Sequence, residues 1–305
     1  MSPGPQSNPN SQWKLSDTRA IDLDRPCVVC IVNTTPDSFS DGGQYNTTQG
    51  ATDRAKRAID DGADMLDIGG ESTRPGAKRV GAEEQIKRVV PVIEAIRKAG
   101  MDIPISVDTT LSQVAARALD AGADAINDVS AMTEDPGMLT LASDRRCGIV
   151  LMHRLTTSDK DSYSDRYESE PVYTDVVDAV CRSLASRRDD AVNAGVPMDR
   201  IVLDPGLGFG KSVEDTISLI RRTGELVGLG CPVMSGLSRK SFVGRMGLGR
   251  DSDPSERVHA TVGLSVVHLL SGARIFRVHD VAEHRSALDA AWAALSGDLN
   301  GDSLV

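Results

Sequence analysis

The chain has 305 residues, of which 40% are hydrophobic and 26% charged, and its formal net charge is −10. These values suit a soluble globular protein of one large domain or two ordinary ones. The acidic balance argues against a nucleic-acid-binding protein, which normally carries a basic patch. Every apolar run is shorter than the roughly 18 residues that span a bilayer, so we expect no membrane segment.

The two ends of the chain differ in composition from the rest. Residues 1–12 are rich in Pro, Ser and Asn and lack the apolar core of a secretory signal. We expect a disordered tail over residues 1–12, one domain over residues 13–296 and a flexible tail over residues 297–305.

The cysteines predict the compartment. Five are present, two of them as Cys27-x-x-Cys30. Positions three apart on a strand face opposite sides, and a zinc site would need a second pair, which the chain lacks. We therefore expect buried thiols in a reducing, cytoplasmic environment.

Strand and helix patterns alternate from residue 27 onward. The predicted strands cover residues 27–32, 65–68, 103–107, 125–126, 148–152, 201–203, 232–234 and 275–278. The predicted helices cover residues 48–61, 81–99, 112–121, 137–145, 173–194, 213–226, 253–271 and 281–295. Ser112 is the expected N-cap of the third helix, and Asp253-Pro254 is expected to open the seventh.

This alternation predicts an α/β protein with a single (β/α)8 TIM barrel. A doubly wound sheet is the alternative, but no strand is followed by the G-x-G-x-x-G fingerprint of such sheets. In barrels of this kind the active site lies at the C-terminal ends of the strands.

A polar residue or loop follows every predicted strand. The first such loop, residues 33–43, comes directly after six apolar residues, and an ordinary surface turn would explain it if it stood alone. Because the pattern recurs, we expect the strand ends to converge on one site. These strand ends are Asn33, Asp67, Asp108, Asn127, His153, Asp204, Ser238, Arg239, Lys240, Arg277 and His279.

Two sets of side chains can be separated at these strand ends. Carboxylates and an amide suit a neutral heterocycle with several donors and acceptors, and this set is Asp108, Asn127 and Asp204. Basic groups suit a phosphate or pyrophosphate, and this set is Arg74, Arg277 and His279, with Lys240 as a further candidate. An ordinary ion pair at the barrel mouth, such as Asp67 with Arg74, would explain any one of them singly.

Residues 205–212, PGLGFGKS, are close to the G-x-x-x-x-G-K-S pattern of a nucleotide-binding loop. Pro205 replaces the first glycine and the loop follows a barrel strand, so we reject a nucleoside-triphosphate site. We expect the glycines to let the backbone approach a flat ligand.

Seven motifs in collinear order resemble those of dihydropteroate synthases. They are NTTPDSFSDGG (33–43), DIGGESTRPG (67–76), ISVDT (105–109), IND (126–128), DPGLGFGK (204–211), SRKS (238–241) and RVHD (277–280). The resemblance covers about residues 27–295. It implies the condensation of 6-hydroxymethyl-7,8-dihydropterin pyrophosphate with 4-aminobenzoate, which gives 7,8-dihydropteroate and pyrophosphate in folate synthesis.

The resemblance also implies a role for each matching residue and a homodimer. Asn33, Asp37, Asp108 and Lys240 would be catalytic, and Asn33 would bind Mg²⁺. The pterin would be bound by Asp108, Asn127, Met152, Asp204 and Lys240. The pyrophosphate would be bound by Asn33, Thr73, Arg74, Arg277 and His279. The 4-aminobenzoate would lie between two mobile loops, near Phe39, Thr73, Pro75, Phe209, Lys240 and Ser241.

Two departures from the family pattern stand out. Thr34 replaces the usual Val, and residues 154–171 form a charged segment in place of the usual Gly-x-Pro-x-x-Met-Gln. A pterin-binding methyltransferase of the same barrel type, which acts on a corrinoid protein, is the alternative enzyme, but it has no use for the basic set. A paralogue that binds pterins without condensing them is the non-enzymatic alternative.

Overall fold

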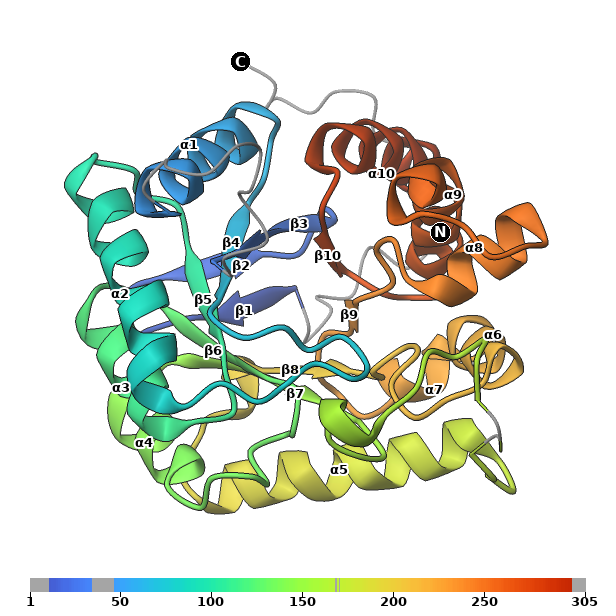
Figure 1. Cartoon of the computed structure of the whole chain (residues 1–305), viewed down its shortest axis with the longest axis horizontal. Helices are drawn as coiled ribbons and strands as arrows, with labels where there is room; N and C mark the ends of the chain where they lie inside the picture. Colours follow the sequence, from blue (N-terminus) through green and yellow to red (C-terminus); the bar gives the residue numbers. More distant parts are fainter. Residues whose placement is uncertain (1–10, 35–46, 168, 170, 298–305) are drawn as a thin grey trace, which may run out of the picture.

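The computed structural model describes residues 11–34, 47–167, 169 and 171–297. Eight parallel strands form one sheet in which each strand neighbours the next along the chain, and β10 pairs back with β3 (Figure 1). A parallel bridge between Leu203 and Val233 joins β8 to the residue before β9 and so completes the ring. The predicted TIM barrel is confirmed.

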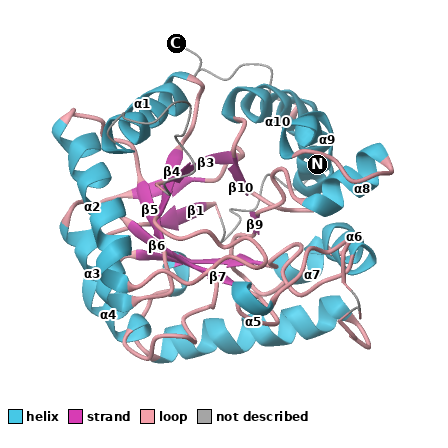
Figure 2. Cartoon of the chain, viewed as in Figure 1, coloured by secondary structure: helices cyan, strands magenta, loops and turns pink. Residues whose placement is uncertain are grey.

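The strands and helices alternate as the sequence predicts (Figure 2). The barrel strands are β3 (Cys27–Asn33), β4 (Met65–Gly69), β5 (Ile105–Asp108), β6 (Ala125–Asp128), β7 (Gly148–Met152), β8 (Ile201–Asp204), β9 (Met234–Ser235) and β10 (Ile275–Val278). The helices are α1 (Thr47–Asp60), α2 (Ala82–Lys98), α3 (Ser112–Asp120), α4 (Met138–Arg145), α5 (Val176–Asn193), α6 (Val213–Arg221), α7 (Thr223–Val227), α8 (Ser241–Leu248), α9 (Val258–Leu270) and α10 (Val281–Ser296). Short 3₁₀ turns are η2 (Ser158–Lys160), η3 (Met198–Arg200) and η4 (Pro254–Arg257).

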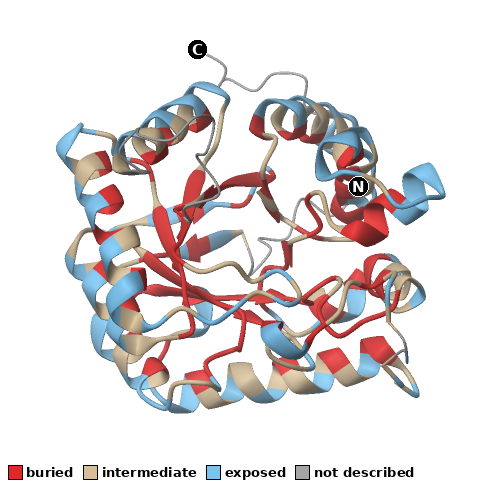
Figure 3. Ribbon diagram, viewed as in Figure 1, coloured by how far each residue is buried: buried red, intermediate tan, exposed pale blue. Residues whose placement is uncertain are grey.

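The barrel strands are buried on both faces, which explains their nearly continuous apolar runs (Figure 3). On β3, Val28 and Cys30 pack between the sheet and the helices, whereas Cys27 and Val29 point into the barrel. The prediction that Cys27 and Cys30 face opposite sides is therefore confirmed. Burial raises the pKa of both thiols, to about 11 for Cys30.

A two-stranded hairpin that the sequence analysis missed fills the N-terminal end of the barrel. It consists of β1 (Gln12–Lys14) and β2 (Ala20–Asp22). Trp13 is fully buried there and its indole donates a hydrogen bond to the carbonyl oxygen of Arg200, at 3.0 Å. Gln12 therefore belongs to the fold rather than to the expected tail; residues 1–10 and 298–305 lie outside the described residues.

Helix starts depend on distant partners as well as on local caps. Ser112 is the first residue of α3 and makes no side-chain cap; instead its N–H donates to the Asp135 carboxylate at 2.7 Å. The predicted Ser112 cap is therefore wrong. The helix expected from residue 173 starts at Val176, where the Asp175 side chain accepts from two backbone N–H groups.

The second half of the barrel is less regular than predicted. The helix expected over residues 213–226 is split at Arg222 into α6 and α7. The segment after Asp253 begins as η4 and becomes helical at Val258, and α8 is an additional helix. Among the described residues, no helix has the length and apolar character needed to cross a membrane.

Candidate active site

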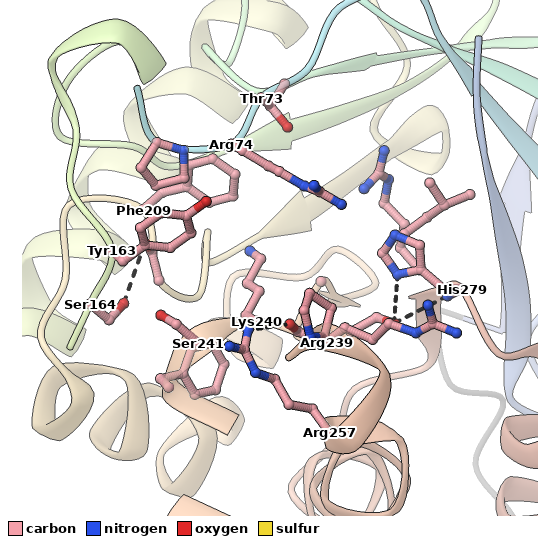
Figure 4. A pocket seen from close by; sticks show the side chains of 18 of the residues that line it. Thr73, Arg74, Tyr163, Ser164, Phe209, Arg239, Lys240, Ser241, Arg257 and His279 are labelled. Atoms are coloured by element: carbon pink, nitrogen blue, oxygen red, sulfur yellow. Dashed lines mark hydrogen bonds between the residues drawn. The ribbon is translucent and has the colours of Figure 1, made fainter. Parts of the chain in front are cut away.

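A cavity of about 380 Å³ lies at the C-terminal ends of the strands (Figure 4). Most of the predicted site residues line it: Asn33, Thr73, Arg74, Pro75, Asn127, Met152, Asp204, Phe209, Lys240, Ser241, Arg277 and His279. Asp108 lines a smaller adjoining hollow. Asp37 and Phe39 lie outside the described residues.

The Arg277 guanidinium is the centre of a buried ionic network. From β10 it donates through Nε to Asp67 at 2.6 Å and through Nη2 to Asp108 at 2.7 Å. Asp67 also accepts from Ser106 at 2.6 Å and from the Asn127 amide at 3.1 Å. The ion pair suggested between Asp67 and Arg74 is therefore wrong, and Arg277 is already engaged by two carboxylates.

Asp108 is almost completely buried at the end of β5. Burial raises the pKa of its carboxyl to about 7, against the opposing charge of Arg277 and with a further increase from Asp67. Such a group changes charge near neutral pH, which suits a carboxylate that stabilises a positive charge formed during a reaction.

Asp204 and Lys240 form the second charged centre of the cavity. Asp204 is buried at the end of β8, and burial raises the pKa of its carboxyl although Lys240 opposes this. The Lys240 ammonium lies 4.1 Å from the centroid of the Phe209 ring and donates to the Leu207 carbonyl at 2.5 Å. Burial lowers the pKa of Lys240 to about 7, against the opposing charge of Asp204.

The glycine-rich loop after β8 is shaped by protein contacts. Gly206 and Gly210 have φ of +65° and +62°. A Cβ on Gly206 would lie 1.8 Å from the carbonyl oxygen of His153, and one on Gly210 would lie 2.3 Å from Leu155. For Gly206 and Gly210 the expectation that the glycines make room for a flat ligand is therefore wrong, because the segment after β7 occupies that space. Gly208, between them, does line the cavity.

Lys211, the lysine of the apparent nucleotide-binding pattern, is fully buried beneath this loop. Its ammonium donates to the carbonyl oxygens of Phe209 at 2.8 Å and Gly206 at 3.0 Å, and it lies 3.0 Å from Nδ1 of His153. Because Lys211 binds protein groups, it serves the loop and not a phosphate, in keeping with the rejected nucleotide site.

The basic residues near β10 are not equivalent. His279 shares a hydrogen bond of 3.0 Å with the Ser238 hydroxyl through Nδ1, and burial lowers the pKa of its imidazole to about 3. Arg239 pairs with Asp280 at 2.8 Å. His279 is therefore neutral at pH 7, and Arg239 is neutralised by a carboxylate.

The loop after β4 carries Arg74 at the mouth of the cavity. The Arg74 side chain is exposed, and within the described residues its guanidinium has no ion pair (Figure 4). Further along the loop, Arg79 bonds to Glu134 at 2.8 Å and to Glu71 at 3.0 Å. This part of the chain is therefore fixed to the barrel rim while Arg74 can meet an anion.

Thr34 has a structural explanation. It is buried beside β4, and its hydroxyl donates to the carbonyl oxygen of Gly69 at 3.0 Å. The hydroxyl thus links the first and second strands of the barrel at the site end, which an apolar Val would not do.

The cavity is also lined by residues that the sequence reasoning did not select, among them Tyr163, Ser164, Arg166 and Arg257. These residues lie in segments with the polar composition typical of solvated loops, so composition alone does not predict that they line a cavity. The available signal was the departure of residues 154–171 from the family pattern, together with their place after a barrel strand.

Comparisons with known proteins agree with this geometry. Residues 29–279 match the family described as "Pterin binding enzyme". The dihydropteroate synthase of Synechocystis sp. is 42% identical over 272 residues, which cover 88% of this chain and 91% of the relative. The dihydropteroate synthase of Streptococcus pyogenes is 45% identical over 254 residues, which cover 83% of this chain and 90% of the relative.

Solved structures give the same result. Xanthomonas albilineans dihydropteroate synthase with 4-aminobenzoic acid is 42% identical and superposes with a TM-score of 0.85, covering 95% of this chain and 99% of that chain. The same enzyme in complex with 7,8-dihydropteroate is 40% identical with a TM-score of 0.80, covering 92% of this chain and 97% of that chain. The chain therefore belongs to the pterin binding enzymes and, within them, to the dihydropteroate synthases.

Proposed function

We propose a division of labour among the cavity residues for the reaction of this family, a step of folate biosynthesis. The enzyme is a transferase that joins 6-hydroxymethyl-7,8-dihydropterin pyrophosphate to 4-aminobenzoate. The observation that carries the division is that one cavity contains buried Asp204 and Asn127 together with Lys240 and with Arg74, which forms no ion pair among the residues that the structure describes.

The pterin binds at the floor of the cavity. Asp204 and Asn127 offer acceptors and donors to the ring edge, since a heterocycle buried there needs a partner for each polar atom. Met152, Val129 and Phe209 form an apolar cluster for the face of the ring. Lys240, next to Asp204 and above Phe209, lies between this floor and the acceptor side.

The pyrophosphate binds at the side where Arg74 and Lys240 supply positive charge. His279 contributes a neutral imidazole and Thr73 a hydroxyl, which serve as hydrogen-bond donors. Arg277 acts chiefly on Asp67 and Asp108, because its guanidinium donates to both of these carboxylates. Its contribution to the pyrophosphate is therefore smaller than the resemblance implies.

In the reaction, the bond between the pterin methylene carbon and the pyrophosphate oxygen breaks, and the oxygen keeps the electron pair. The carbocation is stabilised by the charge of Asp108. The amine nitrogen of 4-aminobenzoate then forms the new C–N bond and loses a proton to solvent. Arg74 and Lys240 stabilise the departing pyrophosphate, as positioned charges do for developing anions.

We also propose that the enzyme uses Mg²⁺. Within the described residues no group of three or more His, Cys, Asp or Glu side chains could hold a metal alone. This fits Mg²⁺, which keeps several waters and binds through few protein groups plus substrate phosphates. Asn33, partly exposed at the end of β3, offers an amide oxygen for it. When bound, the metal neutralises phosphate charge.

Pyrophosphate release in the presence of both substrates and Mg²⁺ tests the function. We expect release that requires 4-aminobenzoate and falls when Asn33 is replaced by Ala, with partial recovery at higher Mg²⁺. Release without the amine, or methyl transfer to a corrinoid protein, would support the alternatives instead.

We further propose a cytoplasmic homodimer with no nucleic-acid partner. The C-terminal half of α9 exposes two large apolar side chains, Val267 by 44% and Leu270 by 58%, which a second copy of the chain would cover. The five thiols are free, and four of them are buried, which suits a reducing compartment. Light scattering would show a mass near 32.4 kDa if the protein were a monomer.

A further inference from the structure

The segment after β7 connects the loops that carry the acceptor side of the cavity. We call residues 154–167 the β7 loop; it lies within the stretch that departs from the family pattern. Arg154 pairs with Glu134, and the carbonyl oxygen of Ser158 accepts a hydrogen bond from the Gly76 N–H at 2.7 Å. The β7 loop thus touches the loop that presents Thr73 and Pro75.

The same loop holds the glycine-rich loop after β8. Asp161 is buried, and its carboxylate accepts from the Gly210 N–H at 3.1 Å and from the Tyr167 hydroxyl at 2.6 Å. Ser164 donates to the Gly208 carbonyl at 3.4 Å. The position of Phe209, between these two glycines, therefore depends on the β7 loop.

On its third side the β7 loop reaches α8 and the segment after it. Asp165 pairs with Arg245 of α8 at 3.2 Å, and Arg166 pairs with Asp251 at 2.5 Å. The loop therefore spans the segments that supply three parts of the expected 4-aminobenzoate site: Pro75, Phe209 and Ser241.

Tyr163 is the aromatic side chain that this loop presents to the cavity. The Arg166 guanidinium lies 5.4 Å from the centroid of its ring, a cation–π distance that fixes the ring from one side. Figure 4 shows Tyr163 and Ser164 on the same side of the cavity as Phe209. An aromatic ligand between these walls would gain offset or edge-to-face contacts.

We infer that Tyr163 is a further specificity-determining residue, whose ring contacts 4-aminobenzoate and limits the size of the amine that fits. Asp161 is its positioning residue, because it anchors the β7 loop to the Gly210 backbone. The inference rests on the proposed placement of the acceptor amine beside Phe209 and Lys240.

Steady-state kinetics of Tyr163→Ala, Tyr163→Phe and the matched control Lys160→Ala test the inference. Lys160 is exposed on the same loop and does not line the cavity. Tyr163→Ala should raise KM for 4-aminobenzoate about 5- to 20-fold, the order expected for a lost aromatic contact. KM for the pterin substrate should stay unchanged, and Tyr163→Phe should behave like the wild type.

Turnover of a bulkier amine tests the same substitution, and here we expect a gain instead of a loss. Tyr163→Ala should increase turnover of the bulkier 4-amino-1-naphthoate relative to 4-aminobenzoate, because the wall is removed. Asp161→Asn should raise KM for 4-aminobenzoate without that gain, because the Tyr163 ring remains on a loosened loop. An unchanged KM in Tyr163→Ala, or a Tyr163→Phe variant as impaired as the Ala variant, would overturn the inference.

Equilibrium binding separates this inference from the proposed reaction. Calorimetry should show that Tyr163→Ala weakens 7,8-dihydropteroate binding at least 5-fold but leaves 6-hydroxymethyl-7,8-dihydropterin binding unchanged. Equal effects on both ligands would reject the acceptor-side role. A wild-type protein that binds both ligands but releases no pyrophosphate would contradict the reaction, whereas the binding ratio would still decide the role of Tyr163.

Discussion

At the scale of single residues, the site depends on charges that compensate one another inside the barrel. The Arg277 guanidinium carries one positive charge between Asp67 and Asp108. Removing such a cation would leave two buried carboxylates unpaired, which is costly. Changing Asp108 alone leaves Arg277 with Asp67, so its function can be tested separately from the fold.

We therefore predict that Asp108→Asn lowers kcat by about 10²- to 10³-fold, the order found when one electrostatic group of a transition state is lost. The melting temperature should change by only a few degrees, since the amide can still accept from Arg277. Rapid-quench kinetics and calorimetry measure the two effects. Turnover equal to that of the wild type would remove Asp108 from the mechanism.

The pH dependence follows from Asp108 and Lys240. Burial raises the pKa of Asp108 to about 7 and lowers that of Lys240 to about 7. Activity needs Asp108 charged, which requires a pH above its pKa, and Lys240 charged, which requires a pH below its own. The kcat/KM profile should therefore be a narrow bell near pH 7.

A variant separates the two limbs of that bell. Lys240→Arg keeps its charge at high pH, because guanidinium does not lose its proton in this range. Its alkaline limb should shift upward while its acid limb stays in place, as Asp108, Arg277 and Asp67 are unchanged. An alkaline limb at the wild-type position would assign that limb to another group.

At the scale of elements, the loop after β8 is a rigid support and not a flexible phosphate cradle. Gly206 has a positive φ, and the added methyl group of Ala would meet the backbone carbonyl of His153. The Lys211 ammonium, buried beneath the loop, donates hydrogen bonds to two of its carbonyl oxygens. The composition of the loop is therefore explained by its contact with the end of β7.

Gly206→Ala should accordingly destabilise the protein by about 2 kcal/mol or more, by backbone strain and displacement of the neighbouring chain. The matched control is Gly224→Ala in α7, where φ is ordinary and, apart from the adjacent residues and the backbone of the helix itself, no described atom lies within 4 Å of the new Cβ. Urea unfolding of both variants measures the difference. Equal stability of the two would show that the loop can move away.

The sequence predicts where these elements end but not which side chains they bring together. The strand ends were predictable, because apolar runs such as residues 27–32 stop abruptly at a polar residue. The partners were not: Arg277 with Asp67 and Asp108 is a contact across the barrel, and periodicity carries no such information. The expected roles of Gly206, Gly210 and Ser112 were wrong, because the close approach of the segment after β7 decides the two glycine positions and a distant Asp135 decides that of Ser112.

At the scale of the whole molecule, the two ends of the barrel have separate tasks. The C-terminal end holds the charged cavity, whereas Trp13 and the N-terminal hairpin fill the other end with apolar side chains. The hairpin was missed because strands of three residues leave little periodicity to detect. A solvent-exposed barrel end would otherwise leave the inner apolar layer open to water.

Trp13→Ala should therefore lower stability by about 3–5 kcal/mol through loss of buried area and an unfilled cavity. KM for both substrates should stay within about 2-fold, because the site lies at the opposite end. Denaturant unfolding and steady-state kinetics measure the pair of effects. The exposed Leu155→Ala, in the β7 loop, is a control with little effect on stability.

Between β8 and β9 the barrel is closed by the bridge of Leu203 with Val233, and β9 has only two residues. Few backbone hydrogen bonds therefore hold β8 and β9 together, and we expect local opening of the sheet to begin between these two strands. Amide protons of residues 203 and 233–235 should exchange with deuterium sooner than those of β4 and β5. Lys240 follows β9, so a ligand that spans the cavity should hold β9 in place and slow this exchange. The exchange rate would then report ligand binding even when no reaction takes place.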